Sequence, residues 1–317
     1  MHKMPIILED AHAVLQQSFM QDLAEIGHLT SRRSSSSEQY QQACREAEIL
    51  VVSGGSHIDY AYMKRLPKLK LITVFGVGYD GIDVKAAKEL GIKVTHTPAV
   101  MKDDVADMAM ALLLNCTREL IEAHKFIERG DWTKGSRPLT VPLNHMKVGI
   151  AGLGRIGIEI ARRLEAFRCE IAYCARHQHE NSYRYFDNIL DLATWAQALI
   201  LIMPLNEQTY HLVDREVLKA LGPDGYIINV ARGKIINTED LILALEHKEI
   251  RGCGLDVFEK EPQLPPPELL NKPNVVLAPH LGSATIGTRN AMANLVLDNI
   301  KAYLADGKVL TSVPELQ

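Results

Sequence analysis

Short apolar runs alternate along this chain with longer segments in which apolar residues recur every three to four positions. The short runs are typical of buried strands and the longer segments are typical of helices. Strands that alternate with helices are joined by crossover connections, so the pattern predicts parallel sheets and an α/β fold. In the first part of the chain we expect strands at residues 6–8, 49–52, 71–74 and 94–96 and a helix at 84–90.

A second series of strands is predicted at residues 147–151, 170–174, 199–203, 226–230, 254–257 and 275–278, with helices at 156–167, 214–221 and 238–246. The last helix, at 284–304, begins beyond this series, and we expect it to return to the first domain. The sequence therefore predicts two doubly wound parallel-sheet domains. The first is discontinuous and comprises residues 1–98 and 287–317, and the second comprises residues 99–286.

Residues 103–129 carry apolar positions at helical spacing and predict one long helix. Its first half is apolar nearly all round, so we expect it to be buried on more than one side. Either it forms part of a subunit interface or it is buried wholly within one chain. The serine-rich segment 31–37 is predicted to be a solvated loop, with a phosphorylation site as the less favoured alternative.

Composition narrows the classes of function. The 317 residues include 35 Lys and Arg against 39 Asp and Glu, a formal net charge of −4. That balance gives no general attraction to nucleic acid or to an anionic membrane, so we expect a small-molecule partner. The five cysteines show no disulfide framework, and neither a signal peptide nor a membrane span is visible, so we expect a cytoplasmic protein with reduced thiols.

A glycine motif indicates a dinucleotide site. Gly152, Gly154 and Gly157 follow the spacing G-x-G-x-x-G between a predicted strand and a predicted helix. The first glycine allows the tight turn, the second lets a pyrophosphate approach the backbone, and the third lets helix and strand pack closely. The helix N-terminus then offers unpaired amides and a positive dipole end to the phosphates.

The end of the next strand bears on the choice of nicotinamide cofactor. An NAD site normally carries an acidic residue there, but this chain has Ala175, followed by Arg176 and His177, with His179 nearby. A guanidinium can bind a 2′-phosphate that a carboxylate would repel. We therefore expect NADP, with NAD less favoured. The alternative, in which Arg176 is a solvated loop residue and either cofactor is used, stays open.

Polar residues that follow the later strands supply candidate chemistry, because ligands collect beyond the carboxyl ends of parallel strands. These residues are Arg232, Asp256, Glu261 and His280. His280 is the natural acid/base group, and a neighbouring Glu261 would stabilise its imidazolium and fix its tautomer. Arg232 would hold a substrate carboxylate and polarise the adjacent carbonyl. No metal site is expected.

Several segments in the same order resemble the D-isomer-specific 2-hydroxyacid dehydrogenases, and within them the NADP-dependent glyoxylate/hydroxypyruvate and hydroxyphenylpyruvate reductases. They are Gly-Val-Gly-Tyr-Asp-Gly-Ile-Asp at 76–83, Asp-Asp-Val-Ala-Asp at 103–107, the glycine motif, and the segments that carry Arg232, Glu261 and His280. The resemblance implies a Rossmann-type cofactor domain, a split flavodoxin-like substrate domain, a cleft between them and a homodimer.

The resemblance also implies residue roles. Amides of Val77 and Gly78 would bind the substrate carboxylate together with Arg232, and Asp256 would contact the nicotinamide amide region. The cofactor would also contact Gly154, Arg155, Ile156, Pro204, Val230 and Gly282. The implied activity is NADPH-dependent reduction of small 2-oxoacids such as glyoxylate, hydroxypyruvate or aryl-pyruvates to D-2-hydroxyacids, with His280 as proton donor. Two alternatives remain, a cofactor-sensing corepressor-like binding protein and an NAD-linked dehydrogenase.

Overall fold

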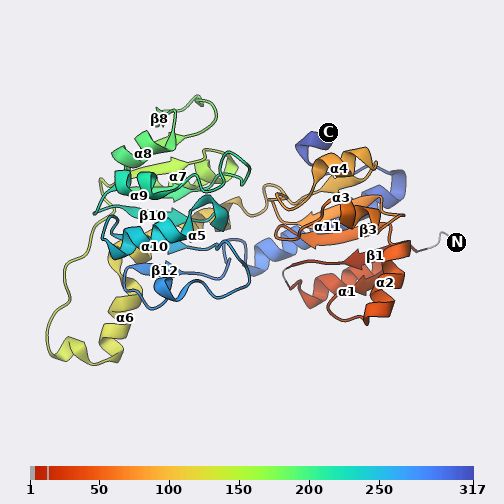
Figure 1. Cartoon of the computed structure of the whole chain (residues 1–317), viewed down its shortest axis with the longest axis horizontal. Helices are drawn as coiled ribbons and strands as arrows, with labels where there is room; N and C mark the ends of the chain where they lie inside the picture. The colour runs from red at the N-terminus through yellow and green to blue at the C-terminus, as the bar shows by residue number, and fades with distance from the viewer. Residues whose placement is uncertain (1–3, 13) are drawn as a thin grey trace. The chain divides into compact units, whose positions relative to one another are not determined.

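Two compact units make up the structure, a computed structural model that describes residues 4–12 and 14–317. One unit comprises the residues up to Met101 together with Thr285–Gln317, and the other comprises Lys102–Ala284. The sequence places the divisions after residues 98 and 286. Each unit contains its own parallel sheet with helices on both faces, so the predicted α/β class is confirmed (Figure 1).

The first unit is built on a five-stranded sheet in the order β2-β1-β3-β4-β5. All neighbouring strands are parallel. The inner strands β3 and β4 are buried at every position because helices cover both faces, which explains their unbroken apolar runs. The strands are β1 (Ile6–Glu9), β2 (His28–Ser31), β3 (Ile49–Ser53), β4 (Leu71–Phe75) and β5 (Lys93–Thr95).

Helices α1 and α11 pack on one face of this sheet, where the ring of Phe19 lies 5.3 Å from that of Phe75. The other helices enclose an aliphatic core on the opposite face. Because α11 comes from the end of the chain, the first unit is discontinuous in sequence. The helices are α1 (Gln17–Ile26), α2 (Ser37–Glu46), α3 (Tyr60–Lys64), α4 (Val84–Glu89), α11 (Ile286–Asp306) and the 3-10 turn η4 (Pro314–Leu316).

The second unit is built on a seven-stranded sheet in the order β12-β11-β10-β9-β6-β7-β8. Every pair is parallel, so all seven carboxyl ends lie at the same edge. The chain reverses its direction of winding between β6 and β9, where open α/β sheets bind ligands. The strands are β6 (Lys147–Ala151), β7 (Glu170–Cys174), β8 (Arg184–Phe186), β9 (Ala198–Leu201), β10 (Tyr226–Asn229), β11 (Gly252–Leu255) and β12 (Val275–Leu277).

Helices α5 and α7 pack together on one face of the second sheet, and α8, α9 and α10 cover the other with a large aliphatic core. They are α5 (Lys102–Arg118), α7 (Arg155–Ala166), α8 (Ile189–Trp195), α9 (Arg215–Leu221) and α10 (Thr238–Glu246), with the 3-10 turns η1 (Asp131–Thr133), η2 (Gly233–Ile235) and η3 (Pro267–Leu269). Among the described residues, no helix is long and apolar enough to cross a membrane.

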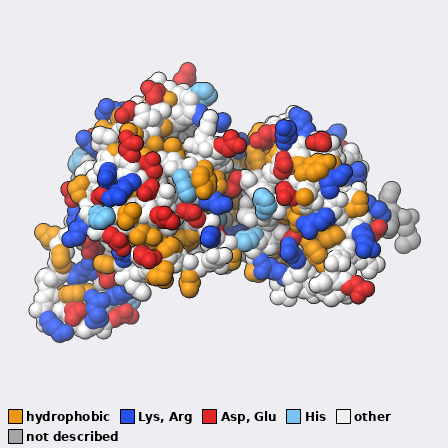
Figure 2. Space-filling view, viewed as in Figure 1, with side chains coloured by type: hydrophobic (Ala, Val, Ile, Leu, Met, Phe, Trp, Pro, Cys, Tyr) orange, Lys and Arg blue, Asp and Glu red, His pale blue; other side chains and the backbone are white. Residues whose placement is uncertain are grey.

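The expected single helix over residues 103–129 is wrong. It breaks at Glu119, which has a left-handed φ of 50°, into α5 and α6 (Leu120–Glu128). At the break, the carbonyl oxygen of Thr117 accepts a hydrogen bond from the amide of Val141. This bond from the returning chain takes the place of the one that a further turn of α5 would donate. Helix α6 and the residues after it project from the unit as an arm with hydrophobic side chains among charged ones (Figures 1 and 2).

The apolar pattern missed two short edge strands. Strand β2 reads His-Leu-Thr-Ser and β8 reads Arg-Tyr-Phe, so neither shows a buried run. The expected loop at 31–37 is wrong at both ends. Ser31 ends β2, and Ser36 caps α2 through a capping box with Gln39.

Candidate active site

The glycine motif forms a tight turn between β6 and α7. Gly152 has a φ of 107°, and a Cβ there would lie 2.8 Å from the carbonyl oxygen of Ile202. A Cβ on Gly157 would lie 2.2 Å from the carbonyl oxygen of Gly152, so helix and turn touch. At Gly154, by contrast, no heavy atom of the described residues other than its chain neighbours lies within 4 Å of an added Cβ. This turn therefore leaves open space at the N-terminus of α7, where Arg155 is exposed and Ile156 half-buried, and it fits a pyrophosphate.

The segment after β7 carries the residues expected to select the cofactor. Ala175 is half-buried, and Arg176, His177 and His179 are exposed. Within residues 4–12 and 14–317, the Arg176 guanidinium forms no ion pair. One carboxylate that the sequence analysis missed, Asp187, lies near Cys174. Burial, followed by the Asp187 charge, raises the pKa of the Cys174 thiol.

His280 and Glu261 form a close pair beyond β12 and β11. The Nδ1 atom of His280 lies 2.6 Å from Oε2 of Glu261, while Oε1 accepts the amide of Phe258 at 2.7 Å. The side chain of His280 is 49% exposed and that of Glu261 26% exposed, so the imidazole can reach a ligand. Burial raises the pKa of Glu261, but the hydrogen bond and charge of His280 outweigh it, and the net pKa is lowered.

Arg232 follows β10, the strand next to β11. One of its terminal nitrogens donates to the carbonyl of Ala231 at 2.7 Å, and its charge helps to lower the pKa of Glu261. The structure therefore brings the three residues proposed for the chemistry to neighbouring strand ends of one sheet. A Cβ on Gly233 would lie 1.9 Å from the carbonyl carbon of Phe258, so the segments that carry Arg232 and Glu261 are in backbone contact.

Asp256 lies beneath the turn that carries His280. It is 2% exposed, and its two carboxylate oxygens accept the amides of Leu281 at 2.7 Å and Gly282 at 2.8 Å. Burial raises the pKa of this carboxyl group, and the two amide hydrogen bonds act in the opposite direction. The structure thus gives Asp256 a role in shaping the turn. Contact with a nicotinamide amide stays a prediction.

Glu259 is a residue that the sequence analysis missed. Its Oε1 accepts both the amide and the hydroxyl of Thr238, at 3.1 and 2.6 Å, and lies 3.5 Å from Nε2 of His211. Burial raises its pKa, but the hydrogen bonds from Thr238 and then the charge of His211 lower it overall. These contacts fasten the segment that carries Glu261 to the start of α10. Only the spacing Glu259-x-Glu261 could have indicated the residue, and an exposed turn would show the same spacing.

The remaining candidates occupy both units. In the second unit, Pro204 follows β9 and Val230 follows β10, both at the sheet edge described above. In the first unit, Val77 and Gly78 follow β4. Within the described part of the chain their amides donate no hydrogen bond, so they are available to an anion. Nδ1 of His96 lies 2.9 Å from the carbonyl oxygen of Val77 and supports this loop.

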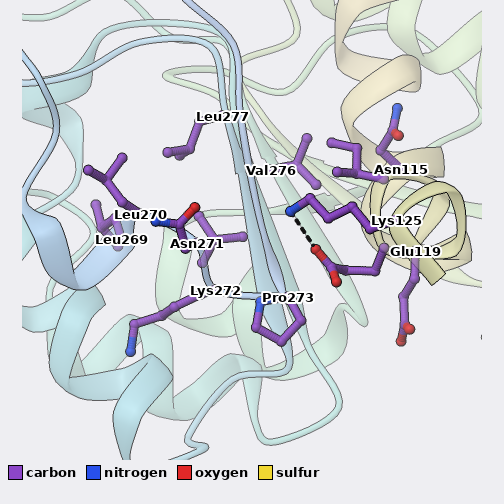
Figure 3. A pocket seen from close by; sticks show the side chains of 13 residues that line it. Asn115, Glu119, Lys125, Leu269, Leu270, Asn271, Lys272, Pro273, Val276 and Leu277 are labelled. Atoms are coloured by element: carbon purple, nitrogen blue, oxygen red, sulfur yellow. Dashed lines mark hydrogen bonds and ion pairs between the residues drawn. The ribbon is translucent and has the colours of Figure 1, made fainter. Parts of the chain in front are cut away.

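A pocket of about 230 Å³ lies elsewhere in the second unit, beside β12 and the start of α6 (Figure 3). Asn115, Glu119 and Lys125 line one side of it, and the ion pair drawn there joins Lys125 to Glu122 at 2.8 Å. It contains none of the candidate residues, so we assign the chemistry to the strand ends. In the described ranges 4–12 and 14–317, no group of three or more His, Cys, Asp and Glu side chains could hold a metal ion.

Comparison with known proteins identifies the family of this chain. Residues 110–282 match the family described as D-isomer specific 2-hydroxyacid dehydrogenase, NAD binding domain. The chain is 43% identical over 265 residues to glyoxylate/hydroxypyruvate reductase A of Arabidopsis thaliana, covering 83% of this chain and 84% of that protein. It is 41% identical over 274 residues to the hydroxyphenylpyruvate reductase of Plectranthus scutellarioides, covering 86% and 87%.

A solved structure is similar over nearly the whole chain. It is an NADPH-dependent glyoxylate/hydroxypyruvate reductase from Sinorhizobium meliloti, in complex with NADP and malonate. The TM-score is 0.90 at 39% sequence identity, and the match covers 99% of this chain and 98% of that one. The chain therefore belongs to the D-isomer specific 2-hydroxyacid dehydrogenases, as its motifs predict.

Proposed function

We propose that this protein reduces small 2-oxoacids to D-2-hydroxyacids with NADPH. The observation that carries the proposal is the close pair of His280 and Glu261, at the same sheet edge as an open glycine turn. In this proposal the second unit binds the cofactor and carries Arg232, Glu261 and His280, and the first unit contributes amides that bind the substrate. The D configuration rests on the family, whose description specifies the D isomer.

Arg232, His280 and Glu261 have separate proposed roles toward the substrate. Arg232 binds the carboxylate and draws electron density from the adjacent carbonyl. His280 donates a proton to the carbonyl oxygen as it becomes a hydroxyl, and Glu261 stabilises the imidazolium before that transfer. When bound, the reduced nicotinamide supplies the hydride that the carbonyl carbon receives. Amides of Val77 and Gly78 are proposed to bind the substrate carboxylate as well.

The cofactor residues extend along the sheet edge. We propose that Gly152, Gly154, Arg155, Ile156 and Gly157 hold the pyrophosphate. The 2′-phosphate would contact Arg176 and His177 beside Ala175. The residues around the other half of the dinucleotide would be Pro204, Val230, Asp256 and Gly282. The similar Sinorhizobium meliloti protein is described as NADPH-dependent, which supports NADP over NAD.

A homodimer is proposed from the arm that α6 begins. Leu120, Ile121 and Ile127 expose 54, 42 and 57% of their surface, and Trp132 exposes 69%. Clustered apolar surface of this kind marks protein interfaces. Light scattering coupled to gel filtration should give twice the chain mass, and Ile127→Glu should reduce it to the mass of a single chain. A wild-type protein that elutes as a monomer would remove this part of the proposal.

The activity is tested by steady-state oxidation of NADPH and NADH with glyoxylate, hydroxypyruvate and phenylpyruvate, each at several concentrations. We expect turnover with at least one of them, higher kcat/KM with NADPH, and a D product by chiral chromatography. Comparable kcat/KM values for the two cofactors would overturn only the NADP preference. Cofactor binding without turnover on any of the three would overturn the proposed enzyme and favour a cofactor-sensing binding protein.

A further inference from the structure

The nine residues between β7 and β8, residues 175–183, form an irregular connection that carries Arg176, His177 and His179. Throughout the described chain, no main-chain hydrogen bond to another main-chain group is formed by this connection. Such a segment would be free to change conformation unless side chains hold it. Two tyrosines from the flanking strands do so.

Tyr173 in β7 and Tyr185 in β8 are direct partners in the parallel register of these strands. Direct partners project from the same face of a sheet, and the two rings accordingly lie 5.3 Å apart at 51°. Tyr173 is fully buried and Tyr185 is half-buried. Both hydroxyl groups therefore extend from one packed base toward the connection.

Each hydroxyl holds a different end of residues 175–179. The Tyr173 hydroxyl accepts the amide of His179 at 2.8 Å and lies 3.3 Å from its carbonyl oxygen, to which it can donate. The Tyr185 hydroxyl donates to the carbonyl of Ala175 at 3.2 Å. Burial, then the charge of Asp187 and a hydrogen bond with it, raise the pKa of Tyr185, so this hydroxyl stays protonated.

Arg176 and His177 lie between these two fixed points. Their side chains are exposed, and among residues 4–12 and 14–317 neither forms an ion pair. A cationic loop that is already ordered loses less conformational entropy when it binds an anion, and so binds it more tightly. Two phenolic hydroxyls thus act on the backbone of the segment rather than on the ligand.

We propose that Tyr173 and Tyr185 are positioning residues that hold residues 175–179 in place for the 2′-phosphate of NADPH. The inference rests on the proposed NADP preference and adds to it. It assigns part of that preference to two side chains that touch no phosphate. Their effect should appear only with ligands that carry a 2′-phosphate, because 5′-phosphates would bind at the glycine turn after β6.

The test compares Tyr173→Phe, Tyr185→Phe and the double variant, which remove hydroxyls and keep the rings. Tyr183→Phe is the matched control, because the Tyr183 hydroxyl donates to Oε1 of Glu165 at 2.8 Å and not to residues 175–179. Calorimetry measures the affinity of the full-length proteins for 2′,5′-ADP and for 5′-AMP. Steady-state kinetics give kcat and KM for NADPH and NADH, and thermal unfolding checks that each variant folds.

Loss of one neutral hydrogen bond corresponds to roughly a two- to tenfold change in affinity. We expect each single variant to lower the affinity for 2′,5′-ADP by that factor and to leave the affinity for 5′-AMP unchanged. KM for NADPH should rise while kcat is retained. Tyr183→Phe should match the wild type. Equal losses of affinity for both ligands, or no loss for either, would overturn the inference. If Tyr173→Phe fails to fold, the result for Tyr185→Phe decides whether the inference holds.

Arg176→Ala, measured alongside, separates this inference from the proposed function. If Arg176→Ala lowers the affinity for 2′,5′-ADP selectively while both tyrosine variants behave like the wild type, only the proposed role of the tyrosines is wrong. If the wild-type protein binds 2′,5′-ADP no better than 5′-AMP, the NADP preference itself is wrong and the inference is overturned with it.

Discussion

His280 and Glu261, 19 positions apart in the chain, approach to 2.6 Å between Nδ1 and Oε2. The contact leaves Nε2 as the nitrogen that can face a substrate, because Nδ1 is occupied by the carboxylate. The second oxygen of Glu261 is held by the Phe258 amide, so the carboxylate cannot rotate freely. This geometry fits the proton donor proposed above.

Glu261→Gln keeps the size of the side chain and removes its charge. We expect turnover to fall, because the amide no longer stabilises the imidazolium that is proposed to donate the proton. Because the pKa of Glu261 is lowered, the wild type should keep this contribution through the neutral range and lose it as the pH falls and the carboxylate is protonated, whereas Glu261→Gln lacks it at every pH. Profiles of kcat against pH for both proteins measure this difference. An unchanged profile would mean that Glu261 only shapes the loop.

His280→Ala removes the proposed proton donor. Turnover should fall by about 10²- to 10⁴-fold, the usual contribution of general acid catalysis. The dissociation constant of NADPH should change little, because we place the imidazole at the substrate carbonyl. Fluorescence titration and steady-state kinetics on the same preparation separate the two quantities. Turnover that survives the substitution would assign the proton transfer to another group.

Arg176→Ala tests the choice between the two nicotinamide cofactors. A hydrogen-bonded contact to a charged group corresponds to roughly a ten- to hundredfold change in affinity, so KM for NADPH should rise by about that factor. KM for NADH should stay near its wild-type value, since that cofactor has no 2′-phosphate. Parallel kinetics with both cofactors give the comparison. Equal losses would show that Arg176 does not read the 2′-phosphate.

Gly154→Ala probes the pyrophosphate. Apart from its chain neighbours, no heavy atom of the described residues lies within 4 Å of the added methyl group, so folding and thermal stability should match the wild type. Affinity for NADPH and NADH should fall together, by about tenfold or more, because the methyl group occupies the space where the phosphates approach the backbone. Calorimetry with both cofactors tests this. If the variant binds both cofactors with wild-type affinity, the pyrophosphate binds elsewhere.

Glu159→Gln tests a cluster of charges between α5 and α7. Oε1 of Glu159 lies 2.8 Å from Nζ of Lys102 and 2.7 Å from Arg162, and the Lys102 bond is the main cause of its lowered pKa. A carboxyl whose pKa is lower in the folded chain stabilises the fold above its ordinary pKa of 4.5 and loses that contribution as the pH falls.

The wild type should therefore resist urea better than Glu159→Gln at pH 7, and the difference should shrink below about pH 4. Glu170→Gln is the matched control, because Glu170 is exposed and, within the described ranges, forms no ion pair. Urea unfolding of all three proteins at the two pH values gives the comparison. A difference that persists at low pH would contradict the role of this charge.

Much of the fold could be predicted because its main strands are buried on both faces and so appear as apolar runs. The polar residues at strand ends could be predicted as neighbours, since parallel strands end at one edge. Arg232, Glu261 and His280 illustrate this, for they follow three adjacent strands.

Other features depend on contacts between distant residues. The break at Glu119 has no local Gly or Pro and arises where Val141 returns to Thr117. Tyr173 and Tyr185 become partners only through the register of β7 and β8, and β8 is three residues long. No periodicity along the chain carries such information, because tertiary contacts override local preference.

The strand order of the second unit has a practical consequence for engineering. The residues proposed to recognise the 2′-phosphate follow β7, near one margin of the sheet, whereas Arg232, Glu261 and His280 follow β10, β11 and β12 at the other. Because two strands, β6 and β9, lie between β7 and β10, substitutions at the two sites should combine additively. Coenzyme choice can accordingly be redesigned in this scaffold while the rate of reduction is kept.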